Sequence, residues 1–341
     1  MENSIDLEII SKELDEGLIL LDLDAIVTYA NPIALSYFGE RILSKPIYNF
    51  IRAPQLIDLI NLEKKPKKFE YIHHANSIQT YIITIIPLTE KATALKIADY
   101  SQKEAFENVR KEFIANISHE LRSPLTSIIG FIETLQNLEV SKDKSNHFLK
   151  IMQDEANRMS RILDDLLSLS KLEINAYIKP VDEINILENL NIVLSTMEIR
   201  LKEKNIRVNL NANNKDSIKS IIKGDFDEIT QVFNNLIDNA IKYSPENKTI
   251  SIDVDYKRND NKLNTISISI SNEGKCIAEE HLPRLTERFY RVDKDRARDV
   301  GGTGLGLAIV KHIMNRHDGE LFITSNSNKK TTFSIILPLI S

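Results

Sequence analysis

The chain has 341 residues, of which 42% are hydrophobic and 27% charged, enough apolar material for two or three domains with buried cores. Forty-nine acidic and 44 basic residues leave a formal charge of −5, which argues against a polybasic nucleic-acid-binding protein. The single cysteine, Cys276, excludes an internal disulfide framework and a cysteine-rich zinc cluster. The sequence has no run of about 18 apolar residues and its acidic start lacks the layout of a signal peptide, so we expect a cytoplasmic chain.

Residues 1–100 have the pattern of a small α+β domain. Two β-branched runs, Gly17–Leu23 and Ile26–Ala30, flank an aspartate-rich turn, which predicts a hairpin. Asn31 followed by Pro32 predicts the start of a short helix that ends at Gly39. Three further strands are predicted at Phe69–His74, Ser77–Leu88 and Ala94–Asp99. Five antiparallel strands with helices on one side make a compact module.

Residues 101–178 have the pattern of a helical hairpin. On a helical wheel with Ile117 as its origin, the apolar side chains of the first helix form one stripe: Phe106, Val109, Phe113, Leu121, Leu125, Ile128 and Ile132. The polar residues 137–145 predict a loop, and a second amphipathic helix follows them. Two helices alone bury two such stripes poorly, so we expect a homodimer built around a four-helix bundle.

Residues 179–341 mix helices and strands and form the third predicted domain. Helices are predicted at Ile184–Asn205 and Phe226–Tyr243, strands at Thr249–Tyr256 and Leu263–Ser271, and a terminal hairpin at Gly319–Ser325 and Thr331–Pro338. The charged stretch Arg291–Thr303 predicts a mobile loop.

One histidine lies on the polar face of the first long helix. His119 falls opposite the apolar stripe, where a plain solvated face is the simplest explanation. Pro124 weakens that explanation, because proline costs about 3 kcal/mol inside a helix and suggests a shaped site. The run SHELRSPLTSIIGF, Ser118–Phe131, resembles the phospho-acceptor box of sensor histidine kinases of two-component systems.

The resemblance implies roles for three residues of this box. His119 would attack the γ-phosphate of ATP, which suits an imidazole because its ordinary pKa of about 6.5 leaves it neutral near pH 7. Glu120 would act as the base that takes the proton from the other ring nitrogen. Ser123 stands where the family usually carries Thr or Asn to position water for dephosphorylation. Because a serine hydroxyl can also orient water, phosphatase activity is implied as well.

A second motif carries two carboxamides on one helix face. Asn235 and Asn239 are four residues apart in NNLIDNAIKYSP, Asn234–Pro245, which resembles the asparagine-rich ATP-binding helix of these kinases. The resemblance implies Asn239 as an oxygen ligand of Mg²⁺, Lys242 as a phosphate contact and Tyr243 as a nucleotide contact. A polar, solvated helix face is the alternative.

A glycine-rich run near the C-terminus resembles the second glycine box of the family. The run GGTGLGLAIV, Gly301–Val310, has neither the G-x-G-x-x-G fingerprint nor the GK[ST] of a Walker loop. Glycines let backbone approach phosphates, and the helix that follows presents free amides at its start. The implied nucleotide contacts are Gly302, Thr303, Gly304, Leu305 and Gly306. ERFYRVDKDRARD, Glu287–Asp299, resembles the phenylalanine box and lid, with Arg291, Arg296 and Arg298 as phosphate candidates or as parts of a solvated loop.

A third nucleotide box departs from the family pattern. The family carries Asp-x-Gly-x-Gly, in which the aspartate accepts a hydrogen bond from the adenine amino group, whereas this chain has Asn272, Gly274 and Cys276 at those positions. We take Asn272, Gly274 and Ile277 as nucleotide contacts. An uncharged acceptor should cost about 1–2 kcal/mol, or roughly tenfold in ATP affinity. Cys276 replaces a glycine whose backbone freedom the loop normally uses.

The resemblance as a whole implies a multidomain sensor kinase. It predicts a PAS-like α+β domain (residues 1–100), a dimerisation and histidine phosphotransfer hairpin (101–178), and an α/β sandwich ATP-binding domain of the histidine kinase, gyrase and Hsp90 type (179–341). The cofactors would be ATP and Mg²⁺, and the partners a response regulator and a second copy of the chain. Contact with a membrane through a partner stays open.

The pathway and the activity each leave alternatives. GFIETL (Gly130–Leu135), Arg158–Glu173 and Ile309–His317 most resemble phosphate-regulon sensor kinases. The rival function is a catalytically weakened kinase that acts as a response-regulator docking scaffold or phosphatase. A non-signalling ATPase is disfavoured by the histidine box. In the PAS-like segment, His73 and His74 are better explained as surface histidines than as haem ligands.

Overall fold

The computed structural model describes residues 14–53, 56, 67–74, 78–89, 92–137, 140–212, 220–259, 262–292, 302–326 and 330–340. Contacts divide the chain into two units, residues 1–114 and 115–341, and the division falls inside helix α4 (Ser101–Asn137). Among the described residues, no helix is both long and apolar enough to cross a membrane.

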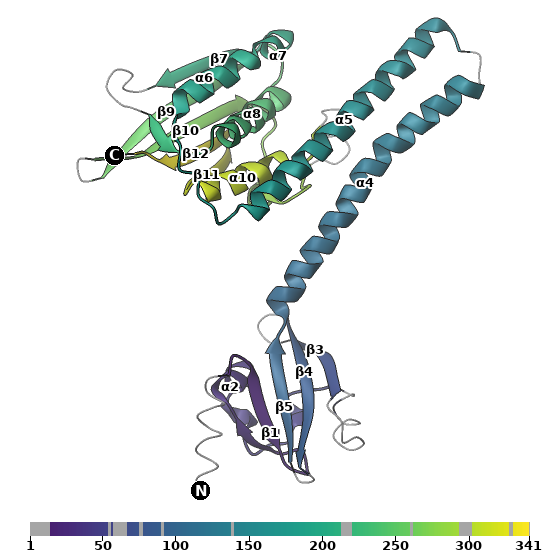
Figure 1. Cartoon of the computed structure of the whole chain (residues 1–341), viewed down its shortest axis with the longest axis vertical. Helices are drawn as coiled ribbons and strands as arrows, with labels where there is room; N and C mark the ends of the chain where they lie inside the picture. Colours follow the sequence, from purple (N-terminus) through teal and green to yellow (C-terminus); the bar gives the residue numbers. More distant parts are fainter. Residues whose placement is uncertain are drawn as a thin grey trace. The chain divides into compact units, whose positions relative to one another are not determined.

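The N-terminal unit is built on a five-stranded antiparallel sheet (Figure 1). The strands, in the order β2-β1-β5-β4-β3, are Val27–Ala30, Gly17–Leu21, Ala92–Asp99, Ile78–Thr89 and Lys67–His74. The predicted hairpin and short helix are confirmed: α2 (Pro32–Phe38) is capped by Asn31, whose Oδ1 accepts from the Ala34 amide. The buried Asn31 also accepts from the Leu18 amide, which ties α2 to β1.

The aromatic rings of this unit gather on one face of its sheet. His73 lies 5.5 Å from the Phe38 ring and 6.1 Å from the Tyr81 ring, measured between centroids. Tyr81 is fully buried, and burial raises the pKa of its hydroxyl to about 12. The environment of His73 is therefore a cluster of rings.

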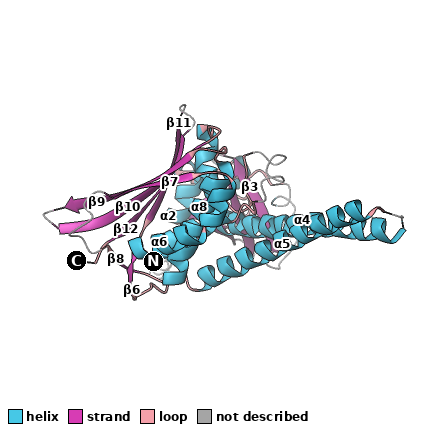
Figure 2. Ribbon diagram, turned by 90° about the horizontal axis from the view of Figure 1, so that it is seen from above, coloured by secondary structure: helices cyan, strands magenta, loops and turns pink. Residues whose placement is uncertain are grey.

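Two long helices form an antiparallel hairpin (Figure 2). Helix α4 continues through Pro124 to Asn137, and α5 (Lys142–Ile174) begins five residues later, so the connection is shorter than the predicted 137–145 loop. Within a single chain the apolar stripes stay partly exposed: Leu125 is 47% exposed and Leu167 62%. Ile162, Leu169 and Leu172 of α5 are buried.

The remainder of the C-terminal unit is a sheet with helices on one face (Figures 1 and 2). The strands, in the order β11-β12-β10-β9-β7, are Glu320–Asn326, Lys330–Pro338, Lys262–Glu273, Thr249–Asn259 and Arg207–Ala212. Only β7 and β9 pair in parallel among these strands. The covering helices are α6 (Ile186–Thr196), α8 (Phe226–Tyr243) and α10 (Gly306–Arg316). The apolar face of α8 is fully buried because Val232, Phe233 and Leu236 meet the sheet side.

The single helix predicted at Ile184–Asn205 is wrong. This segment forms strand β6 (Glu183–Asn185), α6 and α7 (Glu198–Glu203), and β6 pairs with β8 (Ile221–Lys223). Asn185 ends the strand and caps α6, because its Oδ1 accepts from the amides of Leu187 and Glu188. Pairing with a distant strand overrides the local helical pattern.

Candidate functional site

The proposed acceptor histidine lies on an accessible helix face. His119 and Ser123 are both exposed, and their spacing of four residues places them on the same face of α4. Glu120, the next residue, reaches α5 with one of its oxygens: Oε2 accepts a hydrogen bond of 2.8 Å from Nη2 of Arg158. The polar face predicted for His119 is therefore confirmed.

Helix α8 carries the first half of the candidate nucleotide site. The buried Nδ2 of Asn235 has no hydrogen-bond partner among the described residues. A buried donor without a hydrogen-bond partner costs about 1–3 kcal/mol of stability. A ligand that accepts a hydrogen bond from the Asn235 amide would remove that cost, which favours its binding. Two turns on, the Lys242 ammonium lies 2.6 Å from the Asp238 carboxylate, which also pairs with Arg200 of α7. The charge of Lys242 is thereby held beside Asp238, the residue that precedes Asn239.

The glycine loop packs directly against that helix. Gly304 has φ +74, and a Cβ there would lie 2.9 Å from Cα of Phe289, whose amide donates to the Gly304 carbonyl. A Cβ on Gly306 would lie 2.8 Å from Oδ1 of Asn235. Two motifs far apart in the sequence thus meet at the start of α10, the end of a helix at which backbone amides can bind an anion. A Cβ on Gly302 would meet nothing within 4 Å.

The box that departs from the family pattern, Asn272–Cys276, contacts the C-terminal end of helix α8. Asn272 is 3% exposed at the end of β10, and Gly274 lies so close to the Tyr243 carbonyl that a Cβ would approach it to 2.7 Å. The Ile277 amide donates to Oγ of Ser325. Cys276 is exposed and is not among the described residues with positive φ, so its backbone in this chain does not adopt the left-handed conformation that favours glycine.

The stretch predicted as a mobile loop, Arg291–Thr303, is described only at its two ends. Arg291 lies at the first position of this segment and is half-buried. Arg296 and Arg298 lie outside the described residues, as does most of the predicted loop.

A residue of α5 that the sequence analysis did not select reaches the glycine loop. Asp165 Oδ2 accepts a 2.6 Å hydrogen bond from the Thr303 hydroxyl. Burial raises the pKa of the Asp165 carboxyl, while the Thr303 hydrogen bond and Lys242 act in the opposite direction. Asp165 interrupts the apolar pattern of α5, and that interruption is the sequence signal that could have found it.

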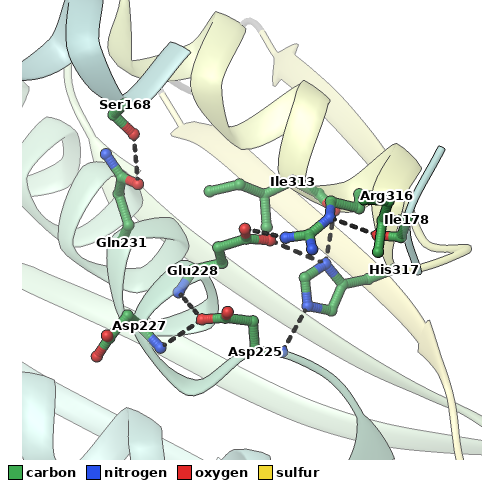
Figure 3. Close-up of polar contacts among 9 residues, drawn as sticks. All are labelled: Ser168, Ile178, Asp225, Asp227, Glu228, Gln231, Ile313, Arg316 and His317. Carbon is green, nitrogen blue, oxygen red and sulfur yellow. Dashed lines mark hydrogen bonds and ion pairs between the residues drawn. The ribbon is translucent and has the colours of Figure 1, made fainter. Parts of the chain in front are cut away.

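Two further polar contacts join α5 to the same part of the molecule. The Ser168 hydroxyl donates to Oε1 of Gln231 at 2.9 Å, as Figure 3 shows, and Arg288 pairs with Glu173. With the Asp165–Thr303 bond, they place α5 rather than the exposed face of α4 against the nucleotide-site elements. In this arrangement, with α5 packed against the glycine loop, the Thr303 hydroxyl is bonded to the Asp165 carboxylate.

A buried polar cluster clamps the ends of α8 and α10 together (Figure 3). Nε2 of His317 accepts from the Asp225 amide at 3.0 Å, so Nδ1 carries the proton and donates to the Ile313 carbonyl. Arg316 pairs with Glu228 and donates from Nε to the Ile178 carbonyl. The segment that follows α5 is thereby tied to both helices that carry the candidate nucleotide-site residues.

This cluster predicts a loss of stability in mild acid. Burial lowers the pKa of His317, so the folded chain holds this side chain neutral while the unfolded chain protonates it near the ordinary pKa of about 6.5. The stabilisation that neutral His317 gives the fold is therefore fully present above about pH 6.5 and is lost as the pH falls below that value. Urea unfolding at pH 7.5 and pH 5.5 should therefore show a smaller pH dependence for His317→Gln than for the unmodified chain. The exposed His147 is the matched control, and an identical pH dependence in His317→Gln and His147→Gln would contradict the assignment.

Comparisons with known proteins agree with this arrangement. Residues 109–175 match the family model described as His Kinase A (phospho-acceptor) domain, and residues 224–341 match the one described as histidine kinase-, DNA gyrase B- and HSP90-like ATPase. The first match contains His119 and Glu120. The second contains the asparagine helix and both glycine-containing boxes.

Two named relatives extend the similarity along the chain. The phosphate regulon sensor protein PhoR of Pseudomonas aeruginosa is 34% identical over 325 residues, which are 94% of this chain and 71% of that protein. The sensor histidine kinase WalK of Bacillus subtilis is 37% identical over 243 residues, 71% of this chain. The match covers only 39% of WalK, so this chain corresponds to part of that relative.

One solved structure matches nearly the whole chain. It is the histidine kinase ThkA in complex with the response regulator protein TrrA, with a TM-score of 0.52 and 23% identity. The match covers 97% of this chain and 98% of ThkA. At that identity the similarity concerns the fold.

Proposed function

The chain belongs to the sensor histidine kinases of two-component systems, and we propose that it transfers the γ-phosphoryl group of ATP to His119 and then to an aspartate of a response regulator. The observation that carries the proposal is the unpartnered amide of Asn235 beside Gly306. An orphaned donor next to a glycine loop and a helix start suits a phosphate-bearing ligand.

Each proposed role uses chemistry that its side chain can supply. The imidazole of His119 is the nucleophile, and Glu120 takes the proton from its other nitrogen. ATP supplies the phosphoryl group, and Mg²⁺ would neutralise charge on its phosphates. The amide oxygen of Asn239 is a hard donor that suits this ion, and Lys242 lies one turn away for the phosphates. Ser123 shares the His119 face and could orient water for dephosphorylation.

The remaining contacts of the proposed nucleotide site surround the adenine and the phosphates. Asn272 and Gly274 would line the adenine side with Ile277 and Tyr243. The loop Gly302–Gly306, which includes Thr303, Gly304 and Leu305, would cover the phosphates. Arg291 would begin the lid over the nucleotide.

The working form of the protein is proposed to be a homodimer. Each long helix leaves apolar side chains uncovered in a single chain, including Ile129 at 46% and Leu163 at 48% exposure. A second copy that completes a four-helix bundle would bury them. The partner that receives the phosphoryl group is proposed to be the receiver domain of a response regulator.

The N-terminal unit is proposed to be a PAS-like sensor that couples to α4. Its five antiparallel strands and covering helix agree with that type of module. Similarity to PhoR supports phosphate-regulon signalling as the pathway, and we propose a cytoplasmic location. ATP binding itself is proposed to require no residue of this unit.

The proposal is tested by incubating the chain with γ-³²P-ATP, with Mg²⁺ or with EDTA. We expect label on the chain only with Mg²⁺, and its passage to added receiver domains of response regulators. A folded dimer that binds ATP but takes up no label would contradict kinase activity. That outcome would favour the rival function, a docking scaffold or phosphatase.

The uncharged Asn272 gives a prediction that tests the proposed adenine contact. Asn272→Asp should raise ATP affinity roughly tenfold, because a charged acceptor makes a stronger hydrogen bond to the adenine amino group. Isothermal titration with a non-hydrolysable ATP analogue measures the change. Thr331, which pairs with Asn272 across the sheet, offers the control Thr331→Ser. An unchanged affinity in Asn272→Asp would show that this position does not contact adenine.

A further inference from the structure

An arginine of α5 binds the carboxylate that follows the acceptor histidine. Nη2 of Arg158 lies 2.8 Å from Oε2 of Glu120, across the hairpin. The Arg158 side chain is 11% exposed and that of Glu120 is 30% exposed. A charge-assisted bond in this partly buried setting has a defined geometry and is screened less by solvent than a surface pair.

Arg158 has few other partners. Its second terminal nitrogen lies 4.0 Å from Glu155 on the preceding turn of α5, and its buried Nε has no hydrogen-bond partner among the described residues. The bond to Glu120 is therefore the closest of its contacts with a carboxylate. A buried guanidinium with an unsatisfied donor costs free energy. Stability alone therefore does not explain why this position carries an arginine.

We infer that Arg158 is a positioning residue for phosphorylation of His119, acting through Glu120. The inference rests on the proposed function. With Oε2 fixed by Arg158, Oε1 remains to accept the imidazole proton. As the phosphorus–nitrogen bond forms at one ring nitrogen of His119 and the bond to the departing ADP oxygen breaks, the proton on the other ring nitrogen moves to Glu120.

The location of the pair adds a consequence for signalling. Glu120 belongs to α4 and Arg158 to α5, so a slide or rotation of one helix against the other changes the orientation of the carboxylate. The reactivity of His119 thereby depends on the packing of the hairpin, even though His119 itself is exposed.

A double-mutant cycle tests the inference: the unmodified chain, Arg158→Gln, Glu120→Gln and the double variant. At saturating ATP we expect Arg158→Gln to slow labelling about 10- to 100-fold with the KM for ATP unchanged, because misplacing a catalytic group affects the chemical step. In the Glu120→Gln background the same change should have less than a threefold effect. If Arg158→Gln multiplies its full factor onto Glu120→Gln, or acts through KM, the inference is overturned.

Two further variants guard against a folding defect. Lys150, an exposed cation of α5 that pairs with Asp154, gives the control Lys150→Gln, which should label at the unmodified rate. Arg158→Lys keeps a charge within reach of Glu120 and should recover to within about fivefold of the unmodified rate, since one contact does not need a planar fork. A lysine variant that folds, dimerises and is as slow as the glutamine variant overturns the inference. Absence of label on the unmodified chain would instead contradict the proposed function.

Discussion

His119→Gln is expected to abolish covalent labelling by γ-³²P-ATP while nucleotide affinity stays unchanged. Glutamine has no nucleophilic ring nitrogen, so the phosphorus–nitrogen bond cannot form. The side chain is exposed on α4, and its replacement removes no packing contact of the buried core. Label counting at a fixed time and titration with an ATP analogue measure the two quantities separately.

The matched control for this substitution is another exposed histidine of the hairpin. His147→Gln lies near the start of α5 and should label at the unmodified rate. Residual label on His119→Gln above that of a heat-unfolded sample would place the acceptor elsewhere in the chain.

Gly306→Val is expected to reduce ATP affinity about 100-fold, which corresponds to roughly 2.7 kcal/mol. A Cβ at this position would lie 2.8 Å from Oδ1 of Asn235, so the carboxamide must move away from the start of α10. The extra methyl groups would also cover the backbone amides that the proposed phosphate contact uses. Gly306→Ala should have an intermediate effect, and equilibrium titration with a fluorescent ATP analogue measures both.

The control for this series is a glycine with free space around it. A Cβ on Gly130 of α4 would meet nothing within 4 Å, so Gly130→Ala should leave ATP affinity unchanged and stabilise the helix by up to about 1 kcal/mol. Equal affinities for Gly306→Val and Gly130→Ala would mean that the contact between the glycine loop and Asn235 does not belong to a nucleotide site.

Local patterns predicted the elements whose signals lie within their own sequence. The cap at Asn31, the long amphipathic helices and the apolar face of α8 follow from propensity and periodicity, and the structure contains them. The prediction of one helix over Ile184–Asn205 is wrong at its start, because Ile184 pairs with Ile222 in a strand that no local pattern indicates, whereas α6 and α7 form most of the rest. Non-local pairing decides such segments.

The candidate site divides along the same line. The asparagine helix and the glycine loop could be selected from their residues, but their contact through Asn235 and Gly306 depends on the tertiary fold. The bond between Asp165 and Thr303 joins α5 to the glycine loop. A single aspartate in an amphipathic helix is ordinarily a solvated residue, so its partner could not be inferred from the sequence.

The hydrogen bond between Thr303 and Asp165 suggests how the proposed activity would be controlled. Thr303 cannot donate its hydroxyl to Asp165 and to a nucleotide phosphate at the same time. Burial raises the pKa of the Asp165 carboxyl, and the hydrogen bond from Thr303 acts in the opposite direction. Nucleotide binding and docking on α5 would therefore compete for one hydroxyl.

The most direct test of the account is to map the phosphorylated residue after incubation of the purified chain with Mg²⁺ and ATP. Digestion under alkaline conditions preserves a phosphorus–nitrogen bond, and mass spectrometry of the peptide that contains Ser118–Phe131 then locates the modification. We predict a single phosphoryl group on His119 that is lost in acid and retained in alkali. An acid-stable phosphate, or one on any other residue, would contradict the account.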